Sequence, residues 1–288
     1  MKKVLITGKN SYIGRSFKRW ITQNKFDYTV DFISVKSDEW KNEAFNNYDV
    51  ILHAAALVHS NKYSQEEHNI INRDLTLEIA TKAKNEGVKH FIFLSTMAIY
   101  GVEEGTINAT TKPKPKTSYG KAKLEAEKLL NFLNDKEFKV SIIRPPMIYG
   151  PSCKGNYIRL SKLAHNTPFF PYINNSRSML FIDNLSEFIR LVIMYELEGV
   201  YTPQNSEYVN TSELVQMIKK CNNKTILLIK SIGFFINYFI KKSSMLQKIF
   251  GTLIYDKEIS QLFDHQRNRL NYNVIAFEES IVRTESKE

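Results

Sequence analysis

The stretch Lys2-Lys3-Val4-Leu5-Ile6-Thr7-Gly8-Lys9-Asn10-Ser11-Tyr12-Ile13-Gly14 decides the fold of this chain. An apolar run leads into a glycine turn, and a helical pattern through Phe17–Ile21 follows. This order of strand, turn and helix is typical of dinucleotide-binding sites. Gly8 would allow the tight turn, Gly14 would let the helix pack closely on the strand, and a pyrophosphate would lie at the helix N-terminus. Ser11 stands where a middle glycine is usual, so its Cβ crowds the phosphate while its hydroxyl could donate to it. An ordinary β-turn-α unit without a ligand is the alternative.

A second motif is Tyr119-x-x-x-Lys123. Residues four apart share one face of a helix. A lysine ammonium beside a phenol favours the phenolate and would lower the pKa of the tyrosine. Such a phenol can pass a proton to or from a sugar hydroxyl or ketone. The spacing also occurs on ordinary exposed helices, so its weight comes from the glycine turn that precedes it.

Short β-rich runs alternate with helical patterns up to about Tyr149, which predicts βαβ units and a parallel sheet. The expected strands are Val4–Ile6, Thr29–Val35, Val50–His53, Phe91–Leu94 and Val140–Ile143. The expected helices are Leu75–Lys84, Lys121–Leu133, Phe181–Glu196 and Ser212–Lys220.

Composition narrows the class of protein. The chain has 288 residues, 43% of them hydrophobic, which fits a globular protein with a large core. Two cysteines cannot form a disulfide framework and no signal peptide is visible, so a cytoplasmic location is expected. The formal net charge is +10, with lysines and arginines along the whole chain. No nucleic-acid-binding module accompanies this charge, so no nucleic-acid partner is expected.

Further landmarks resemble, in order, those of the extended short-chain dehydrogenases/reductases of the NAD-dependent epimerase/dehydratase family. They are the glycine turn, the alanines after Asp49–His53, Asn72 opening a helix, the strand Phe91–Leu94 with its following hydroxyls, and Ile142–Pro151. The resemblance covers nearly the whole chain. It implies an α/β fold with a doubly wound, Rossmann-like parallel sheet. Residues 1–150 would form the dinucleotide-binding domain, and residues 151–288 mainly a smaller substrate-binding lobe, partly interleaved with the sheet.

The resemblance also implies the site residues. The catalytic residues would be Thr96, Tyr119 and Lys123, with Thr96 rather than Ser95 as the catalytic hydroxyl. The cofactor would contact Gly8, Ser11, Tyr12, Ile13, Gly14, Ala54, Ala55, Ala56, Lys123 and Pro146. The substrate, a nucleotide-diphosphate sugar, would contact Arg177. By their positions in the sequence, His59 after the alanine-rich loop and Asn156 after Gly155 are further candidate substrate contacts. Arg177 resembles the family arginine on the diphosphate, the alternative being a surface salt bridge. His53 ends an apolar strand and is expected to be structural. No metal is expected.

Two absences limit the reaction that the resemblance implies. Nucleotide-sugar dehydratases of this family carry Asp-Glu after the catalytic threonine, where this chain has Met97 and Ala98. Members that epimerise C3 and C5 use a cysteine near the serine, and no cysteine lies between Thr96 and Tyr119. The expectation is therefore redox chemistry at a single sugar carbon, either 4-epimerisation or 4-ketoreduction. A reductase of another carbonyl and a non-catalytic dinucleotide-binding protein are the alternatives.

The choice between NAD and NADP depends on where the second strand ends. If it ends near Phe32, Asp31 could bind the ribose hydroxyls of NAD. If it ends at Val35, which the pattern slightly favours, Ser34 and Lys36 could accept the extra phosphate of NADP. The sequence leaves both cofactors open.

The stretch Thr225–Ile240 is apolar but interrupted by Lys230 and Gly233, and it is too short for a membrane span. The simplest interpretation is a core strand followed by a core helix. The alternative is an amphipathic surface that contacts a membrane, with Lys241 and Lys242 at its edge. No transmembrane segment is expected. The resemblance is also compatible with a homodimer, since family members often pair helices across a dimer.

Overall fold

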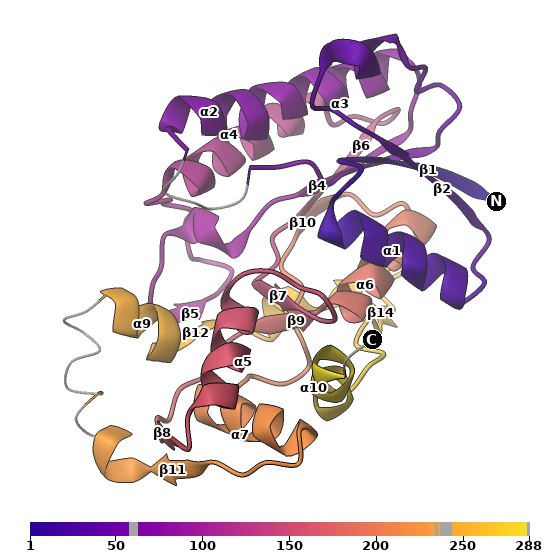
Figure 1. Cartoon of the computed structure of the whole chain (residues 1–288). Coiled ribbons are helices and arrows are strands. Elements are labelled where there is room, and N and C mark those ends of the chain that lie inside the picture. Colours follow the sequence, from indigo (N-terminus) through magenta and orange to yellow (C-terminus); the bar gives the residue numbers. More distant parts are fainter. Residues whose placement is uncertain (58–62, 234–235, 237–243, 287–288) are drawn as a thin grey trace.

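The computed structural model describes residues 1–57, 63–233, 236 and 244–286 (Figure 1). Its centre is a parallel sheet of six strands in the order β10-β6-β4-β3-β1-β2. The strands are β1 (Lys2–Thr7), β2 (Tyr28–Ile33), β3 (Val50–His53), β4 (His90–Leu94), β6 (Lys139–Ile143) and β10 (Gly199–Tyr201). The order runs outward from the β1–β3 pair in both directions, so the predicted doubly wound parallel sheet is confirmed.

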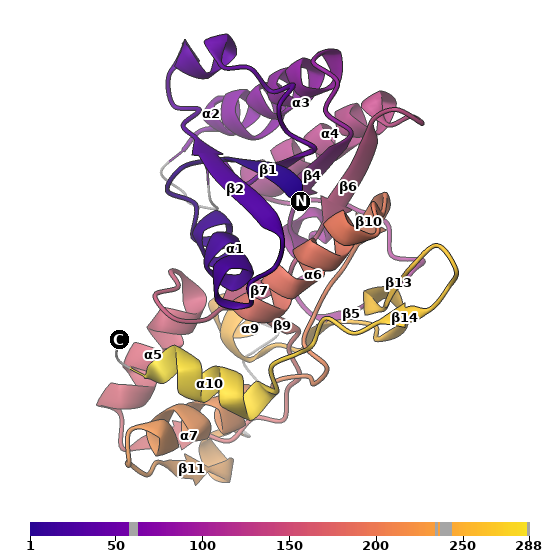
Figure 2. The ribbon, with the colours of Figure 1, turned by 90° about the vertical axis from the view of Figure 1, so that its right-hand side faces the viewer.

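Helices cover both faces of this sheet, as Figures 1 and 2 show. They are α1 (Tyr12–Gln23) and α6 (Ile182–Met194) on one face, and α2 (Gln65–Asn69), α3 (Leu75–Asn85) and α4 (Ser118–Leu133) on the other. Successive side chains of a strand point to opposite faces. Val4 and Ile6 accordingly belong to the core under α1 and α6, while Leu5 belongs to the core under α3 and α4. The continuous apolar runs of the strands are explained by burial on both faces.

The helical stretch before α3 differs from the prediction. A π-helix over Ile70–Asp74 joins α2 to α3, so Asn72 lies inside a continuous helical segment and does not open a helix. Its buried amide bonds both main-chain groups of Leu57, with Leu57 N at 2.9 Å and Leu57 O at 3.1 Å. These bonds hold the loop that follows β3 against the helical layer.

Most of the chain after residue 150 packs below this sheet in Figure 1. Its helices are α5 (Asn156–Asn166), α7 (Thr211–Cys221), α9 (Ser244–Phe250) and α10 (Phe277–Glu285). Its short strands are β8 (Phe169–Pro171), β9 (Met179–Phe181), β11 (Leu227–Ile229), β12 (Leu253–Tyr255), β13 (Leu262–Phe263) and β14 (Arg269–Leu270), and β9 pairs with β7 (Met147–Tyr149), which lies just before residue 150. Strand β5 (Gly105–Ile107) pairs with β12, and 3-10 turns cover Asp38–Asn42, Met97–Tyr100 and Glu258–Ser260. Helix α6 and edge strand β10 return to the central sheet, although the division at residue 150 stays a prediction.

Two sequence-based expectations about strands are wrong. Strand β2 ends at Ile33, two residues before Val35, because its partner β1 ends opposite it at Thr7 and the chain turns at Gly8. Strand β11 is not a core strand: it pairs with β8 in a two-stranded sheet, and Leu227 is 65% exposed. Residues 234–235 and 237–243, with Lys241 and Lys242, lie outside the described residues. Within the described part, no helix has both the length and the apolarity to cross a bilayer.

Candidate functional site

The turn between β1 and α1 has the geometry that a phosphate-binding turn needs. Gly8 has a φ of +91°, and a Cβ there would lie 3.0 Å from Ala55 N. A Cβ on Gly14 would lie 2.7 Å from a methyl group of Ile6, so the missing side chain lets α1 pack onto β1. The first turn of α1 carries no acidic residue. The positive end of the helix dipole is therefore not neutralised from within α1, which suits an anionic ligand.

Ser11 caps this helix. Its Oγ accepts a hydrogen bond from Gly14 N at 3.2 Å. The serine oxygen therefore satisfies one of the free N–H groups of the first turn, while its hydroxyl proton stays available for donation. Tyr12 follows, and its buried hydroxyl has no hydrogen-bond partner among the described residues. The main-chain N–H groups of Tyr12 and Ile13 belong to the orphan donors of the helix start.

The remaining predicted cofactor residues stand at the same edge of the sheet. Ala54, Ala55 and Ala56 directly follow β3, and Ala54 N donates to Thr7 O at 3.3 Å. Pro146 lies shortly after the end of β6 and is buried. The carboxyl ends of parallel strands are where α/β sheets bind their ligands. The residues present thus fit a dinucleotide along this edge, and their individual contacts remain predictions.

The structure brings the three predicted catalytic residues together. Thr96 follows β4 and caps the turn Met97–Tyr100, with its Oγ1 accepting from Ala98 N at 3.2 Å. Tyr119, in the first turn of α4, forms a hydrogen bond with the side chain of Thr96. Lys123 lies one helical turn later, and its Nζ donates to Leu94 O at 2.9 Å. Helix α4 and the end of β4 therefore place the phenol beside the Thr96 hydroxyl and hold the lysine amine on the last carbonyl of the same strand.

The protonation equilibria differ from the sequence-based expectation. Burial raises the pKa of Tyr119 to about 12, although the hydrogen bond from Thr96 pulls it down. Burial also lowers the pKa of Lys123 to about 7, against the opposing effect of Glu127. The predicted lowering of the tyrosine pKa is therefore not found, because desolvation of the phenolate outweighs the hydrogen bond from Thr96.

His53 is a structural histidine, as its place at the strand end predicts. Its Nδ1 is 2.8 Å from Thr7 Oγ1 and its Nε2 is 3.0 Å from Thr76 Oγ1. The ring is fully buried. Burial, together with the charge on Lys123, lowers the pKa of His53 to about 3, so the ring is neutral and both its nitrogens are occupied.

A buried ionic network beside the catalytic residues escaped the sequence analysis. Glu127 accepts from the hydroxyl of Ser95 and from Arg144, whose Nη2 lies 2.6 Å from Glu127 Oε2. Arg144 Nη1 also donates to the hydroxyl of Tyr100 at 2.8 Å. The network ties the ends of β4 and β6 to α4. The available signal was the four-residue spacing that continues from Tyr119 and Lys123 to Glu127 on one helix face.

His68 is a second residue that the sequence analysis missed. It is buried, its Nδ1 is 3.0 Å from the amide nitrogen of Asn72, and its ring centroid is 6.0 Å from that of Tyr119. The imidazole thus forms part of the wall around the phenol. Nothing in the local sequence marks it, since the contact joins α2 to α4.

The predicted substrate residues do not meet as one group in the described structure. Arg177 lies before β9, and its Nη1 donates to Gly251 O at 2.7 Å, just after α9. Arg177 forms no salt bridge within the described residues. The structure therefore does not show the surface salt bridge that was the alternative for this residue. Asn156 is exposed at the start of α5. His59 lies outside the described residues. The roles of all three stay predictions.

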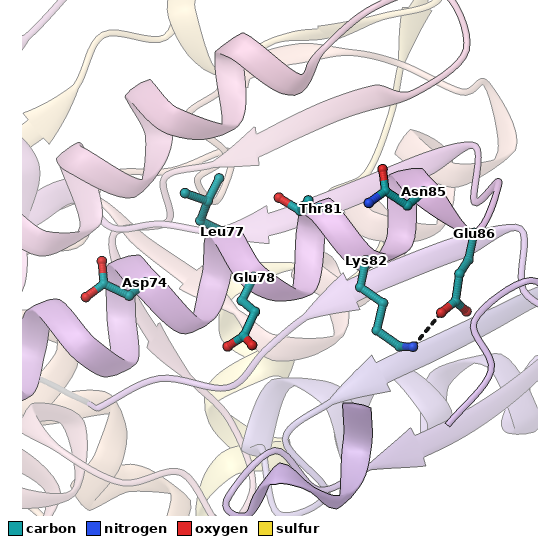
Figure 3. A pocket seen from close by; sticks show the side chains of 7 residues that line it. All are labelled: Asp74, Leu77, Glu78, Thr81, Lys82, Asn85 and Glu86. Atoms are coloured by element: carbon teal, nitrogen blue, oxygen red, sulfur yellow. Dashed lines mark hydrogen bonds and ion pairs between the residues drawn. The ribbon is translucent and has the colours of Figure 1, made fainter. Parts of the chain in front are cut away.

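The hollow drawn in Figure 3 is not this site. It runs along the outer face of α3 from Asp74 to Glu86. Lys82 pairs there with Glu86, and Glu78 pairs with Lys41 at 2.7 Å. None of the predicted catalytic or cofactor residues lines it, and its charges are largely paired among themselves. Nor do three His, Cys, Asp or Glu side chains gather as a metal site within the described residues.

Comparison with known proteins agrees with this geometry. Residues 4–201 match the model of the NAD dependent epimerase/dehydratase family. The UDP-glucose 4-epimerase of Vibrio cholerae is 29% identical over 247 residues, covering 75% of this chain and 74% of that protein. The N-acetyl-alpha-D-glucosaminyl-diphospho-ditrans,octacis-undecaprenol 4-epimerase of Escherichia coli O157:H7 is 27% identical over 199 residues, covering 67% of this chain and 60% of that protein.

Solved structures show the same fold. The UDP-glucuronic acid 4-epimerase of Bacillus cereus in complex with NAD has a TM-score of 0.71 at 17% identity, covering 98% of this chain and 97% of that chain. RMD of Pseudomonas aeruginosa complexed with NADPH has a TM-score of 0.65 at 16% identity, covering 80% and 87%. The structural neighbours thus include proteins solved with either nicotinamide cofactor.

Proposed function

The chain belongs to the NAD-dependent epimerase/dehydratase family, and we propose that it is a nucleotide-sugar 4-epimerase or 4-ketoreductase acting at C4 of a UDP-hexose or UDP-N-acetylhexosamine. The observation that carries this proposal is the hydrogen bond between Thr96 and Tyr119, with Lys123 held one turn away on the carbonyl of Leu94. The relatives named as 4-epimerases support the choice of carbon and put epimerisation first.

Proton transfer at the sugar oxygen is the task of the protein. The nicotinamide, when bound, gives or takes the hydride at the adjacent carbon. Tyr119 gives or takes the proton on the oxygen, and Thr96 holds that oxygen in line with the phenol. Burial raises the pKa of Tyr119 to about 12, which favours the protonated phenol as donor to a keto oxygen. For the opposite direction, a charged Lys123 would stabilise the phenolate.

4-Ketoreduction is the second candidate, because it would use the same three residues. A reductase needs only proton donation from Tyr119, whereas an epimerase needs both directions in one turnover. Residues 97 and 98 are methionine and alanine, which cannot transfer protons, and this argues against elimination of water in either case.

The other parts of the proposal rest on resemblance. Arg177 would hold the substrate diphosphate, because a guanidinium fork suits phosphate oxygens and no carboxylate among the described residues neutralises it. Asn156 and His59 would contact the sugar nucleotide. We further expect a cytoplasmic location, a homodimer and a product that supplies surface polysaccharide.

The test is incubation with a panel of UDP-sugars and UDP-4-keto sugars, following epimer formation and NAD(P)H consumption. Epimer formation without added cofactor identifies the epimerase, and consumption only with keto sugars identifies the reductase. Tyr119→Phe should lower turnover by roughly 10²–10⁴-fold while nucleotide binding persists. Tyr195→Phe is the matched control, since Tyr195 follows α6 at the opposite edge of the sheet. Full turnover in Tyr119→Phe would refute the mechanism.

Arg177→Ala separates the sugar proposal from its rival. A nucleotide-sugar enzyme should show a raised KM for the UDP substrate, because the diphosphate loses its cation. A reductase of a carbonyl compound without a diphosphate should keep its activity in this variant.

A further inference from the structure

The excess positive charge of the chain is confined to two stretches. Residues 151–182 contain four lysines and arginines, and residues 214–255 contain seven, with no aspartate or glutamate in either. Together they account for the whole formal net charge of +10, and the rest of the chain is nearly neutral. Charge gathered in this way creates a positive potential where the two stretches meet at the surface.

The fold brings parts of these two stretches to one end of the molecule. Strand β8 of the first pairs with strand β11 of the second, and α5 packs against α7. In both views this group lies at the end of the molecule farthest from α3 and α4 (Figures 1 and 2). The exposed cations on these elements and the loops beside them include Arg159 on α5 and, nearer the β8–β11 pair, Lys162, Lys220, Lys224 and Lys230. Lys219 contributes no exposed charge, because it is buried and its Nζ donates to His165 O at 3.2 Å.

Two large apolar side chains are exposed in the same place. Phe169 is 51% exposed and Leu227 is 65% exposed. They are direct partners in the parallel register of β8 and β11, so they project from the same face of the small sheet. The neighbouring pair differs, since Phe170 is buried in the main core. The pair is held firmly, because Leu227 N donates to Pro168 O at 3.1 Å and Ser212 Oγ donates to Pro171 O at 2.9 Å.

We propose that this surface, formed by Phe169, Leu227, Lys162, Lys220, Lys224 and Lys230, docks the protein on an anionic lipid bilayer. Exposed apolar side chains bordered by lysines suit the boundary between acyl chains and acidic headgroups. A second copy of this chain is a poor occupant, because it would bring the same lysines together. The nearest exposed acidic residue on these elements, Glu213, lies at the other end of α7 from Lys220. The proposal does not depend on which sugar the enzyme converts.

The experiment is co-sedimentation of the full chain with lipid vesicles, without any sugar substrate. The chain should bind vesicles of phosphatidylcholine with phosphatidylglycerol, bind phosphatidylcholine alone at least about tenfold more weakly, and lose binding as salt rises. Phe169→Ser/Leu227→Ser and Lys220→Glu/Lys224→Glu should each weaken binding to the mixed vesicles by about tenfold or more. Thermal unfolding of each variant confirms that it is folded.

Helix α4 offers matched controls on the far end of the molecule. Phe132→Ser removes a side chain that is 84% exposed, and Lys121→Glu/Lys128→Glu makes the same change of net charge at two exposed lysines. Both controls should bind vesicles as the wild type does. The proposal is overturned if the chain does not bind the mixed vesicles. It is equally overturned if the α4 variants lose as much binding as the Phe169/Leu227 and Lys220/Lys224 variants. It is also overturned if the Phe169/Leu227 change instead dissolves a dimer seen by light scattering, or if RNA binding alone responds to the lysine changes.

Discussion

Glu127 accepts hydrogen bonds from Ser95 and Arg144 in the interior, where the Arg144 side chain is 13% exposed and that of Glu127 only 3%. Because Ser95 precedes Thr96 and Glu127 follows Lys123 by one turn, the pair links the segments that carry the proposed catalytic residues. We therefore expect Glu127 and Arg144 to act by positioning these segments.

Removing one charge of this pair should lower the free energy of unfolding far more than replacing both residues with apolar ones. Glu127→Gln leaves Arg144 buried without a counter-charge, and we expect the free energy of unfolding to fall by about 3–5 kcal/mol. The double variant Glu127→Leu/Arg144→Met should be less destabilised than either single change, because no charge stays buried. Urea unfolding monitored by circular dichroism measures the free energy of unfolding of each single variant and of the double variant. Additive losses in the double variant would contradict the account.

Asp31 should contribute little to cofactor choice. Its carboxylate accepts from the Tyr48 hydroxyl at 3.2 Å, and it lies two residues inside the end of β2, so Ser34 is the first residue after the strand. We expect Asp31→Asn to change NAD affinity by less than about twofold, whereas Ser34→Asp should favour NAD over NADP. Fluorescence titration with both cofactors tests this. A large loss of NAD binding in Asp31→Asn would assign the ribose contact to Asp31.

At the scale of elements, the junction of β1 with α1 is determined by contacts that only small residues permit. Gly14 faces Ile6 on β1, and Gly8 faces the loop after β3 at Ala55. Helix α4 is placed in a comparable way, because a Cβ on Gly120 would lie 2.9 Å from Ala98 O. Close approach of the helix starts to the strand ends thus shapes both halves of the candidate site.

Gly14→Ala is the test at this scale. The added methyl group would lie 2.7 Å from a methyl of Ile6, so α1 must shift away from β1. We expect a loss of about 1–3 kcal/mol in the free energy of unfolding, together with weaker dinucleotide binding. Gln23→Ala, at an exposed position in the last turn of α1, is the control and should change neither. Unchanged stability in Gly14→Ala would show that α1 can move without cost.

At the scale of the whole molecule, buried bases make stability depend on pH. Burial lowers the pKa of His53 to about 3 and that of His90 to about 4, from an ordinary value of 6.5. Between these values the unfolded chain binds protons that the folded chain does not, so the free energy of unfolding falls as the pH drops below 6.5. Lys123 acts in the same sense between about 7 and its ordinary value of 10.5, where stability rises with pH.

The measurement is urea unfolding of the wild type and His53→Gln at pH 7.5 and pH 5. The wild type should lose stability on acidification, and His53→Gln should lose less, because the variant has no imidazole to protonate on unfolding. The free energy of unfolding of His53→Gln should be lower than that of the wild type at both pH values, since Thr7 and Thr76 lose hydrogen bonds. Equal pH dependence in the two proteins would show that His53 does not carry the effect.

Local patterns were enough to predict the central sheet, the glycine turn and the shared helix face of Tyr119 and Lys123. Strand alternation, the positions of Gly8 and Gly14, and a spacing of four on a helix are all properties of residues close together in the sequence. The family pattern supplied Thr96 instead of Ser95, and the structure places the Ser95 hydroxyl on Glu127 instead of beside the phenol.

Only the tertiary structure decided the rest. These features depend on residues that are distant in the chain. They are the raised pKa of Tyr119, the Glu127–Arg144 pair, the contact of Arg177 with the carbonyl after α9, and the exposed Phe169–Leu227 pair. Burial and charge pairing are sums over neighbours in space. A sequence pattern shows which side chains lie on one face of an element. How far those side chains are desolvated depends on the other elements that pack against that face.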